Sequence, residues 1–386
     1  MSTSTSTSHS VSGLDWRLGG TAGIRPGARN SITDVPGVRL GHAARTSEGW
    51  LTGVSVVAVP GGARAAVDVR GGGAATRETA ALDPTGVVDR IHAIALTGGS
   101  AYGLEASAGV MAALRERGLG FRVGAEKRAV VPIVPAAAIF DLGRGGDFGN
   151  HPDAHLGREA AERALAEPRA DESPEQGSVG AGAGAITGEM RGGVGAASAV
   201  LPGGAVIAAL VVVNADGTTV DPRTGVPWGA FAELSLPSGE GEFGVRQPTI
   251  DEHEGALARL GEEAGRRPAL RPLNTTLAVV ATDAALTRAE LARLASASHD
   301  GMARAVRPVH TLGDGDVVFS LSTGDAVLPE PAPGLHPEHR RADSVNQLLT
   351  AGADVVTRAI VHAILSVSSA RTPAGLVPSY RDLYGQ

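Results

Sequence analysis

The chain of 386 residues is 42% hydrophobic, carries a formal net charge of −7 and contains no cysteine. This composition supports a sizeable folded core, and it excludes disulfides, cysteine nucleophiles and thiolate metal sites. An acidic chain also lacks the basic surface that nucleic acid binding requires, so we expect no nucleic acid partner.

Aliphatic side chains must form most of the core, because aromatic residues make up 3% of the chain while glycine occurs 54 times. Glycine lets backbones approach closely, which favours layered sheets and helices. The sequence suggests no membrane span, and residues 1–13 lack the apolar centre of a signal peptide. We therefore expect a cytoplasmic protein with a disordered tail over 1–29 and a single domain over 30–386.

In the first part of the chain, apolar runs bounded by turn residues predict strands at 54–59 and 92–97. A glycine turn follows the second strand, and then a helix that ends at Gly118. The apolar run 130–142 leads into a glycine-rich loop, after which 156–167 has the composition of a helix.

The middle of the chain contains a hairpin signal and a polar stretch. The turn Pro202-Gly203-Gly204 separates two apolar runs, the second of which ends at Asn214. Residues 238–272 are rich in Gly, Glu, Arg and Pro, with a weak helix near 254–265. This is the least core-like stretch after the tail.

The last part alternates strands and helices. Residues 275–284 predict a strong strand, and Thr287 with Glu290 has the spacing of a helix capping box. A further strand is predicted over 309–323, and a long apolar helix over 344–369 closes the chain. The order of elements predicts sheets covered by helices.

The change from a polar linker to a buried strand falls at the junction of Asn274 and Thr275. A threonine whose own amine is freed by cleavage carries its general base with it, since an α-amino group titrates near about 7.7 to 8.0. The Thr275 hydroxyl can free that amine itself by attacking the Asn274 carbonyl. The same residues also fit an ordinary turn into a strand.

Asp314 and Asp316 lie within an otherwise apolar strand pattern, where residues two apart point to one face. Such a carboxylate pair can orient an N-terminal ammonium and shift its own protonation by like-charge repulsion. A β-turn is the alternative, because Asp-Gly is a strong turn signal. Asn214 can stabilise an oxyanion with its side-chain amide, or it can simply form a turn.

Taken in order, several segments resemble the P1 family of self-processing peptidases, which includes β-peptidyl aminopeptidases, the D-esterase/L-aminopeptidase and nylon-oligomer hydrolase. The resemblance runs from Asn30 to Tyr384. Its markers are ITDVPGVRLGH, ALTGGSAYGL, VVPIVPAAAIFDL, GEMRGGVGAAS, VVVNADG, LNTTLAVVAT and GDGDVVFSLSTG.

The resemblance implies an α+β fold, an αββα sandwich of the N-terminal-nucleophile kind. It also implies an α chain that ends at Asn274 and a β chain that begins at Thr275. Asn-Thr at the cut, with Asp314 and Asp316 after it, is similar to the nylon-oligomer hydrolase branch. Heterodimers of this kind are expected to associate, as tetramers of such pairs.

By the same matching, Asn214 takes the place of the oxyanion-stabilising asparagine. Arg191 stands where the family has a lysine that contacts the acidic pair, so it is expected to anchor Asp314 or Asp316 but cannot act as a base. Phe140 replaces a tyrosine near the substrate. Apart from the resemblance, Tyr102 on the first turn of a predicted helix is a second candidate for the substrate pocket, although a tyrosine at such a place can also simply be packed.

We therefore expect a self-processing amide hydrolase that acts on linear oligoamides such as 6-aminohexanoate oligomers, or on peptides, through an acyl-enzyme. Two other enzyme types remain open, an exo-acting β-peptidyl or L-aminopeptidase and an acyltransferase like the ornithine acetyltransferases. A non-enzymatic scaffold is the third possibility. The scattered histidines show no metal-binding spacing, so no metal or other cofactor is expected.

Overall fold

The protein is described by a computed structural model that covers residues 23–166, 175–266, 273–328, 331 and 334–385. Most of the predicted tail, residues 1–22, lies outside the described residues. Ordered pairing nevertheless begins before residue 30, because the backbone of Arg25 forms a β-bridge with Val200. The predicted boundary after residue 29 is therefore too late.

Nine strands form the main sheet, in the order β10-β11-β12-β13-β2-β4-β7-β3, with β1 paired to β2. The strands are β1 (Arg39–Arg45), β2 (Thr52–Val69), β3 (Ala75–Arg77), β4 (Ile91–Thr97), β7 (Ala136–Ala138), β10 (Val194–Val200), β11 (Val206–Val212), β12 (Leu277–Ala284) and β13 (Val317–Ala326). Short pairs join β5 (Phe121–Arg122) to β6 (Val130–Val131), β8 (Ile186–Thr187) to β9 (Met190–Arg191), and β14 (Ala370–Thr372) to β15 (Gly375–Val377).

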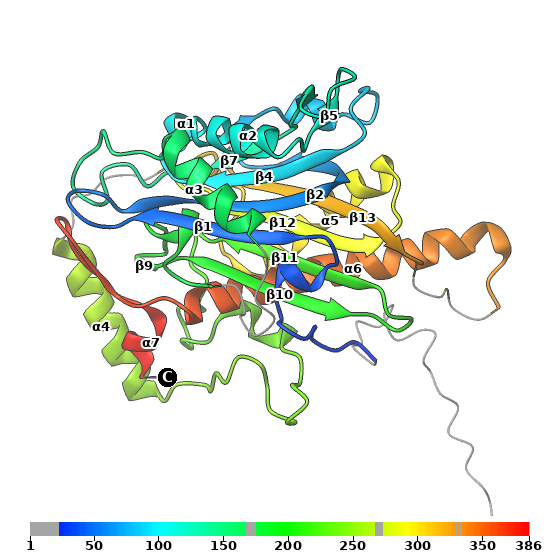
Figure 1. Ribbon diagram of the computed structural model, residues 1–386. Helices are drawn as coiled ribbons and strands as arrows, with labels where there is room; N and C mark the ends of the chain where they lie inside the picture. The colour runs from blue at the N-terminus through cyan, green and yellow to red at the C-terminus, as the bar shows by residue number, and fades with distance from the viewer. Residues whose placement is uncertain (1–22, 167–174, 267–272, 329–330, 332–333, 386) are drawn as a thin grey trace, which may run out of the picture.

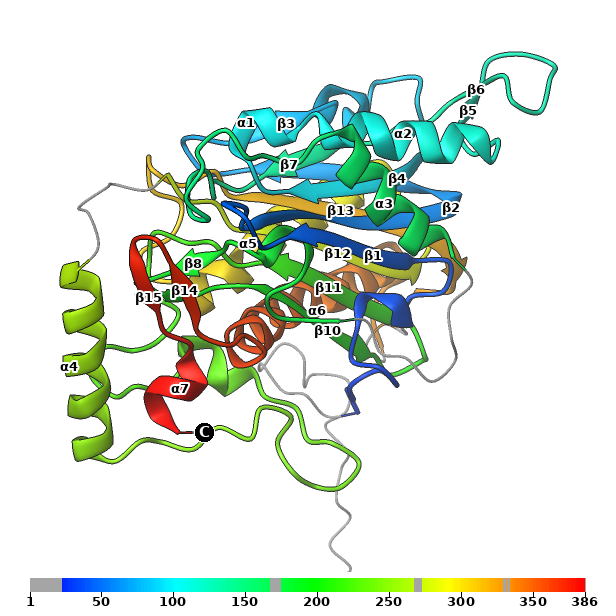
Figure 2. The same cartoon turned by 60° about the vertical axis from the view of Figure 1, so that its left-hand side comes forward.

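The helices are α1 (Ser100–Gly103), α2 (Ala106–Glu116), α3 (Ala154–Leu165), α4 (Ile250–Arg266), α5 (Arg288–Ala305), α6 (Pro337–Leu365) and α7 (Tyr380–Tyr384). Figure 1 shows α2 at the top, above β4, with α3 beside it, and α6 at the level of β10 and β11, against which it packs. From the second direction, α4 and α7 stand beside the layered body (Figure 2), where they pack on each other.

The long strand β2 connects two layers of sheet. Its first half pairs with β1 and β4, and residues 64–69 pair with β13 after a register shift. One buried cluster lies between the layers and includes Val57, Ile94, Leu210 and Phe319. Two further clusters lie under the helices, one beneath α5 and α6 and the other beneath α2 and α3. The chain thus has the expected αββα sandwich.

Glycine explains how the helices come so close together. A Cβ added at Gly109 of α2 would lie 1.7 Å from the backbone oxygen of Ala154, and one at Gly157 of α3 would lie 1.9 Å from that of Ala106. No side chain fits at either contact. The glycine-rich, aromatic-poor composition therefore does serve close backbone packing, as the sequence predicts.

Helix α6 is long and apolar enough to pass a composition test for a membrane span, although the sequence suggests none. However, 78% of the apolar window is buried inside the protein, where it packs against β10, β11 and α5. Burial of this kind is what the central helix of a sandwich layer requires, so its apolar composition has a structural cause.

Candidate active site

The site forms at one end of β12, where three chain segments meet. Strand β12 is antiparallel to β11 and parallel to β13. The residues that follow β11 and those that precede β12 and β13 therefore lie at the same edge of the sheet. This topology brings together Asn214, the Asn274–Thr275 junction and the segment with Asp314 and Asp316.

Thr275 is buried, with 4% of its surface exposed, and so is Asn274. The Thr275 hydroxyl donates a hydrogen bond to the Asn274 carbonyl oxygen at 2.5 Å. The backbone N–H of Gly315 donates to the same oxygen at 2.9 Å, and the Thr275 N–H donates to the Asn214 carbonyl at 2.6 Å. The Asn274 carbonyl is thus polarised by two donors, one of which is the predicted nucleophile.

Asp314 lies in the segment before β13. Its side chain accepts from the Thr311 hydroxyl at 2.8 Å, from the Thr311 N–H at 3.1 Å and from the Asp216 N–H at 3.2 Å. Burial raises the pKa of Asp314, and the negative charge of Asp316 raises it further. Asp314 is therefore easier to protonate than an ordinary aspartate.

Asp316 accepts from the Thr276 N–H at 2.7 Å and contacts Nδ1 of His310, also at 2.7 Å. Neither carboxylate makes a hydrogen bond to Thr275 itself. Of the two interpretations of this pair, the strand is wrong and the turn is correct, because β13 begins only at Val317 and the Asp314 N–H donates to the Thr311 carbonyl. The two aspartates come together instead through the turn that precedes that strand.

The Asn214 side chain is oriented by its partners. Its Oδ1 accepts hydrogen bonds from Nη1 of Arg144 and, at 3.2 Å, from the N–H of Ile186. Among the described residues, the one partner of its amide nitrogen is the Phe140 carbonyl, at a long 3.4 Å. The amide N–H groups are therefore the least engaged part of this buried side chain, as an oxyanion donor requires.

Arg191 does not meet the acidic pair, contrary to the expectation from the resemblance. Its Nη2 donates to the Ala183 carbonyl at 2.7 Å and to Ser178 Oγ at 3.1 Å. Its Nε and Nη1 are buried without a hydrogen-bond partner. Burial lowers the pKa of Arg191 to about 10. Arg191, at the end of β9, thus bonds to Ala183 and Ser178 rather than to Asp314 or Asp316.

The two predicted pocket residues are placed differently. Phe140 is partly buried, and its backbone carbonyl contacts Asn214. The Tyr102 side chain is 63% exposed and lies against His151, with ring centroids 5.4 Å apart. Among the described residues, Tyr102 makes no hydrogen bond to the site.

Sequence reasoning missed Arg144, Asp216 and His310. Arg144 lies in the glycine-rich loop after β7 and donates to Asn214, to the Gly184 carbonyl at 2.7 Å and to Asn274 Oδ1 at 3.5 Å. Burial lowers its pKa to about 10. A lone arginine among glycines, after a strand that ends near the site, was the only available signal.

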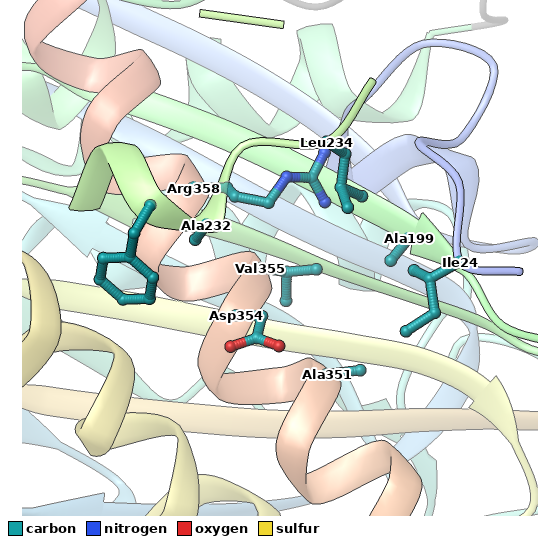
Figure 3. A pocket seen from close by; sticks show the side chains of 9 residues that line it. Ile24, Ala199, Ala232, Leu234, Ala351, Asp354, Val355 and Arg358 are labelled. Carbon is teal, nitrogen blue, oxygen red and sulfur yellow. The ribbon is translucent and has the colours of Figure 1, made fainter. Parts of the chain in front are cut away.

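No group of three or more His, Asp or Glu side chains suited to a metal ion occurs within the part of the chain that the structure describes. The pocket in Figure 3 lies elsewhere, between α6 and β10, and is lined by Ile24, Ala199, Val355 and Asp354 among others. None of the predicted site residues lines it, so this cavity is separate from the chemistry at Thr275.

A model of peptidase family S58 matches residues 30–377. The chain belongs to peptidase family S58. An uncharacterized aminopeptidase of Mycobacterium tuberculosis is 43% identical over 92% of this chain and 98% of its own length. A 6-aminohexanoate-oligomer endohydrolase of Kocuria is 36% identical over 79% of each chain. This S58 chain is therefore an enzyme of the amidohydrolase or peptidase type.

Solved structures agree on the fold. A Burkholderia β-aminopeptidase superimposes with a TM-score of 0.65 at 25% identity, covering 94% of both chains. An L-aminopeptidase D-Ala-esterase/amidase from Ochrobactrum anthropi, described as a variant of the N-terminal-nucleophile hydrolase fold, gives 0.61 at 20% identity. At that identity the likeness concerns the fold alone. The S58 chain is thus an α+β sandwich of the N-terminal-nucleophile hydrolase kind.

Proposed function

We propose that this S58 enzyme cuts its own backbone between Asn274 and Thr275, and that the freed Thr275 then hydrolyses amide bonds. The observation that carries the proposal is the buried hydrogen bond of 2.5 Å from the Thr275 hydroxyl to the Asn274 carbonyl. It places the hydroxyl beside the carbonyl group that it would attack. The Gly315 N–H, at 2.9 Å from the same oxygen, would stabilise the negative charge that forms there.

Self-cleavage proceeds through an ester. Thr275 Oγ1 forms a bond to the Asn274 carbonyl carbon, the peptide C–N bond breaks, and the Thr275 nitrogen takes up the hydroxyl proton. Water then hydrolyses the resulting ester, which leaves a carboxylate on Asn274 and a free hydroxyl and amine on Thr275. The same hydroxyl is then available for substrate.

In turnover, the α-amine of Thr275 would act as the base, since such amines titrate near about 7.7 to 8.0. The Asn214 carbonyl, which accepts from the Thr275 nitrogen at 2.6 Å, would hold that amine in place. The Asn214 side-chain amide would donate to the oxyanion. Asp314 and Asp316 would tune the amine through their negative charge rather than by direct contact with the hydroxyl.

For the substrate, we propose linear oligoamides or short peptides. The 6-aminohexanoate-oligomer endohydrolases among the relatives support the first, and the aminopeptidases support the second. Acyl transfer is the second candidate function. A product assay with an added amine separates it from hydrolysis, because an acyltransferase would convert the amine into an amide.

We also propose that the processed enzyme is cytoplasmic and associates with copies of itself. Sedimentation velocity of the purified enzyme tests the association, and a particle with the mass of one chain would contradict it.

Intact mass under denaturing conditions is the deciding experiment. We expect two fragments from the wild type, the smaller beginning at Thr275, and a single intact chain from Thr275→Ala. Thr276→Ala is the matched control, because its side-chain hydroxyl has no hydrogen-bond partner, and it should still be cut. A wild-type chain that stays whole while it hydrolyses amides would contradict the proposal.

A further inference from the structure

The side chain of Asn274 marks a place that the substrate must later occupy. In self-cleavage and in turnover the same Thr275 hydroxyl attacks a carbonyl carbon. Both reactions then pass through an ester on Thr275 Oγ1 with the Thr275 amine free, so the acyl group of that ester takes the same place in both. The surroundings of Asn274 accordingly describe the acyl-side subsite of the enzyme.

Two charged residues hold the two ends of the Asn274 carboxamide. Nη2 of Arg144 lies 3.5 Å from Oδ1, and the amide nitrogen lies 3.4 Å from Oδ1 of Asp216. Arg144 can only donate and an ionised Asp216 can only accept, so the pair recognises a group that has both a carbonyl oxygen and an N–H. A substrate carboxamide that takes the place of the Asn274 side chain would meet the same two partners.

Both recognition residues are held by contacts that do not involve Asn274. Arg144 is fixed by the Gly184 carbonyl and by the Asn214 side chain. The backbone of Asp216 is fixed by its N–H donation to Asp314 at 3.2 Å. The Arg144 side chain and the Asp216 backbone therefore keep these contacts when the Asn274 end of the cut chain leaves.

The subsite is also open to a ligand. Asp216 is exposed, whereas two other residues near the Asn274–Thr275 junction, Asn214 and Asp314, are buried. Among the described residues, Arg144 donates hydrogen bonds to the oxygens of Gly184, Asn214 and Asn274, and its charge also interacts with the buried carboxyl group of Asp141. Its donor to Asn274 is thus free for another carbonyl once Asn274 departs.

From these contacts, we infer that Arg144 and Asp216 form an acyl-side subsite that selects acyl groups bearing a carboxamide, as in asparaginyl amides. A leucyl group has a similar shape but no polar atoms, so it would offer no hydrogen bond to Arg144 or to Asp216. An aspartyl carboxylate would place a negative charge beside Asp216. The inference rests on the proposed function, since it takes Thr275 as the nucleophile.

The first test compares p-nitroanilides of asparagine, aspartate and leucine, whose side chains are nearly equal in size. We expect kcat/KM for the asparagine compound to exceed the other two by about tenfold, a typical effect of one charge-assisted hydrogen bond. In Asp216→Ala the ratio of asparagine to leucine should fall to within about threefold. Asp251→Ala, an exposed change on α4, is the matched control and should keep the wild-type ratio.

The second test uses the chain as its own substrate. Precursors with Asn274→Leu or Asn274→Asp should cut themselves about tenfold more slowly than the wild type, as followed by denaturing mass over time. Equal kcat/KM for the three anilides, or an asparagine preference that survives Asp216→Ala, would overturn the inference. If no anilide is hydrolysed, the precursor rates decide, and equal rates would overturn it.

The two proposals fail in different ways. An uncut wild-type chain contradicts the proposed function. A wild type that is cut at Asn274 but shows no preference among acyl groups contradicts only the subsite.

Discussion

Two regions of this enzyme contain arginines whose hydrogen-bond partners differ in charge. Arg358, in α6, is 1% exposed, donates to Glu242 through two nitrogens at 2.5 and 2.7 Å, and also reaches Asn30 and the Ser198 carbonyl. Arg144, at the site, donates its hydrogen bonds to neutral oxygens, although its charge also interacts with the carboxyl group of Asp141. Its neighbour Arg191 has two buried nitrogens without a hydrogen-bond partner among the described residues.

The difference separates a structural role from a chemical one. A buried ion pair with all its donors satisfied fixes the positions of the segments that it joins, and it is costly to break. Cationic donors that are only partly engaged leave capacity for a ligand or a developing charge. The Arg358 cluster should therefore control stability, and the Arg144 region should control reactivity.

The largest expected effect concerns Arg358→Met. The change leaves Glu242 as a buried charge without its main partner, which should lower the free energy of unfolding by about 3–5 kcal/mol. Urea unfolding followed by circular dichroism measures this loss. A loss below about 1 kcal/mol would show that the cluster is not the structural anchor that its geometry suggests.

Next in size is Asn214→Ala. The change removes an amide donor from the reacting carbonyl, so turnover should fall by about 10²- to 10³-fold, equivalent to roughly 3–4 kcal/mol in the barrier. Rates of self-cleavage and of amide hydrolysis should be measured on protein whose folding is verified by circular dichroism. Retention of the wild-type rate would remove Asn214 from the mechanism.

Ionisation of Glu242 should make stability depend on pH, with an effect of similar size in free energy. Burial alone would raise the pKa of Glu242, but hydrogen bonds from His362 and Arg358 outweigh it and lower the pKa to about 2. Because the native pKa lies below the ordinary value, the carboxylate stabilises the fold above about pH 4.5 and loses this contribution as the pH falls toward 2. The contribution is about 3 kcal/mol.

Glu242→Gln isolates that contribution. The difference in unfolding free energy between wild type and variant should be largest near neutral pH and should shrink as the solution is acidified. A difference that stays constant from neutral to acidic pH would contradict the depressed pKa.

The smallest expected effect is that of a lysine substitution at Arg191, which can be compared directly with the same substitution at Arg358. Arg191→Lys should lower the free energy of unfolding by less than about 1 kcal/mol, because a lysine ammonium can replace the bonds to Ser178 and Ala183. Arg358→Lys should cost more, since a lysine cannot grip Glu242 with two parallel bonds. Equal losses of unfolding free energy in the two variants would contradict a structural role that is specific to Arg358.

Local signals in the sequence predicted local structure well. The turn at Pro202–Gly204 does join β10 and β11, which pair from Val200↔Val206 onward. Thr287 and Glu290 do form the capping box of α5. In each case a few neighbouring residues contain the whole physical cause, and no distant part of the chain is needed.

The site residues that could be predicted are those at the ends of strands that the sequence itself reveals. Thr275 and Asn214 stand at the ends of recognisable strands, and the sheet pairs those ends. The position of Arg144 depends on how a glycine loop folds over the sheet, which no local pattern encodes. At Asp314 the apolar alternation indicates a strand and Asp-Gly indicates a turn. The side-chain bonds to Thr311 that stabilise the turn cannot be read from alternation.

The order of strands has a consequence for the enzyme after processing. Strands β12 and β13 lie between β11 and β2, so a cut at Asn274 would leave the second fragment threaded through the middle of the first. The two pieces could part only if the central sheet came apart. Such a cut would be undetectable by gel filtration of the native enzyme, and the two chains would melt as one cooperative unit.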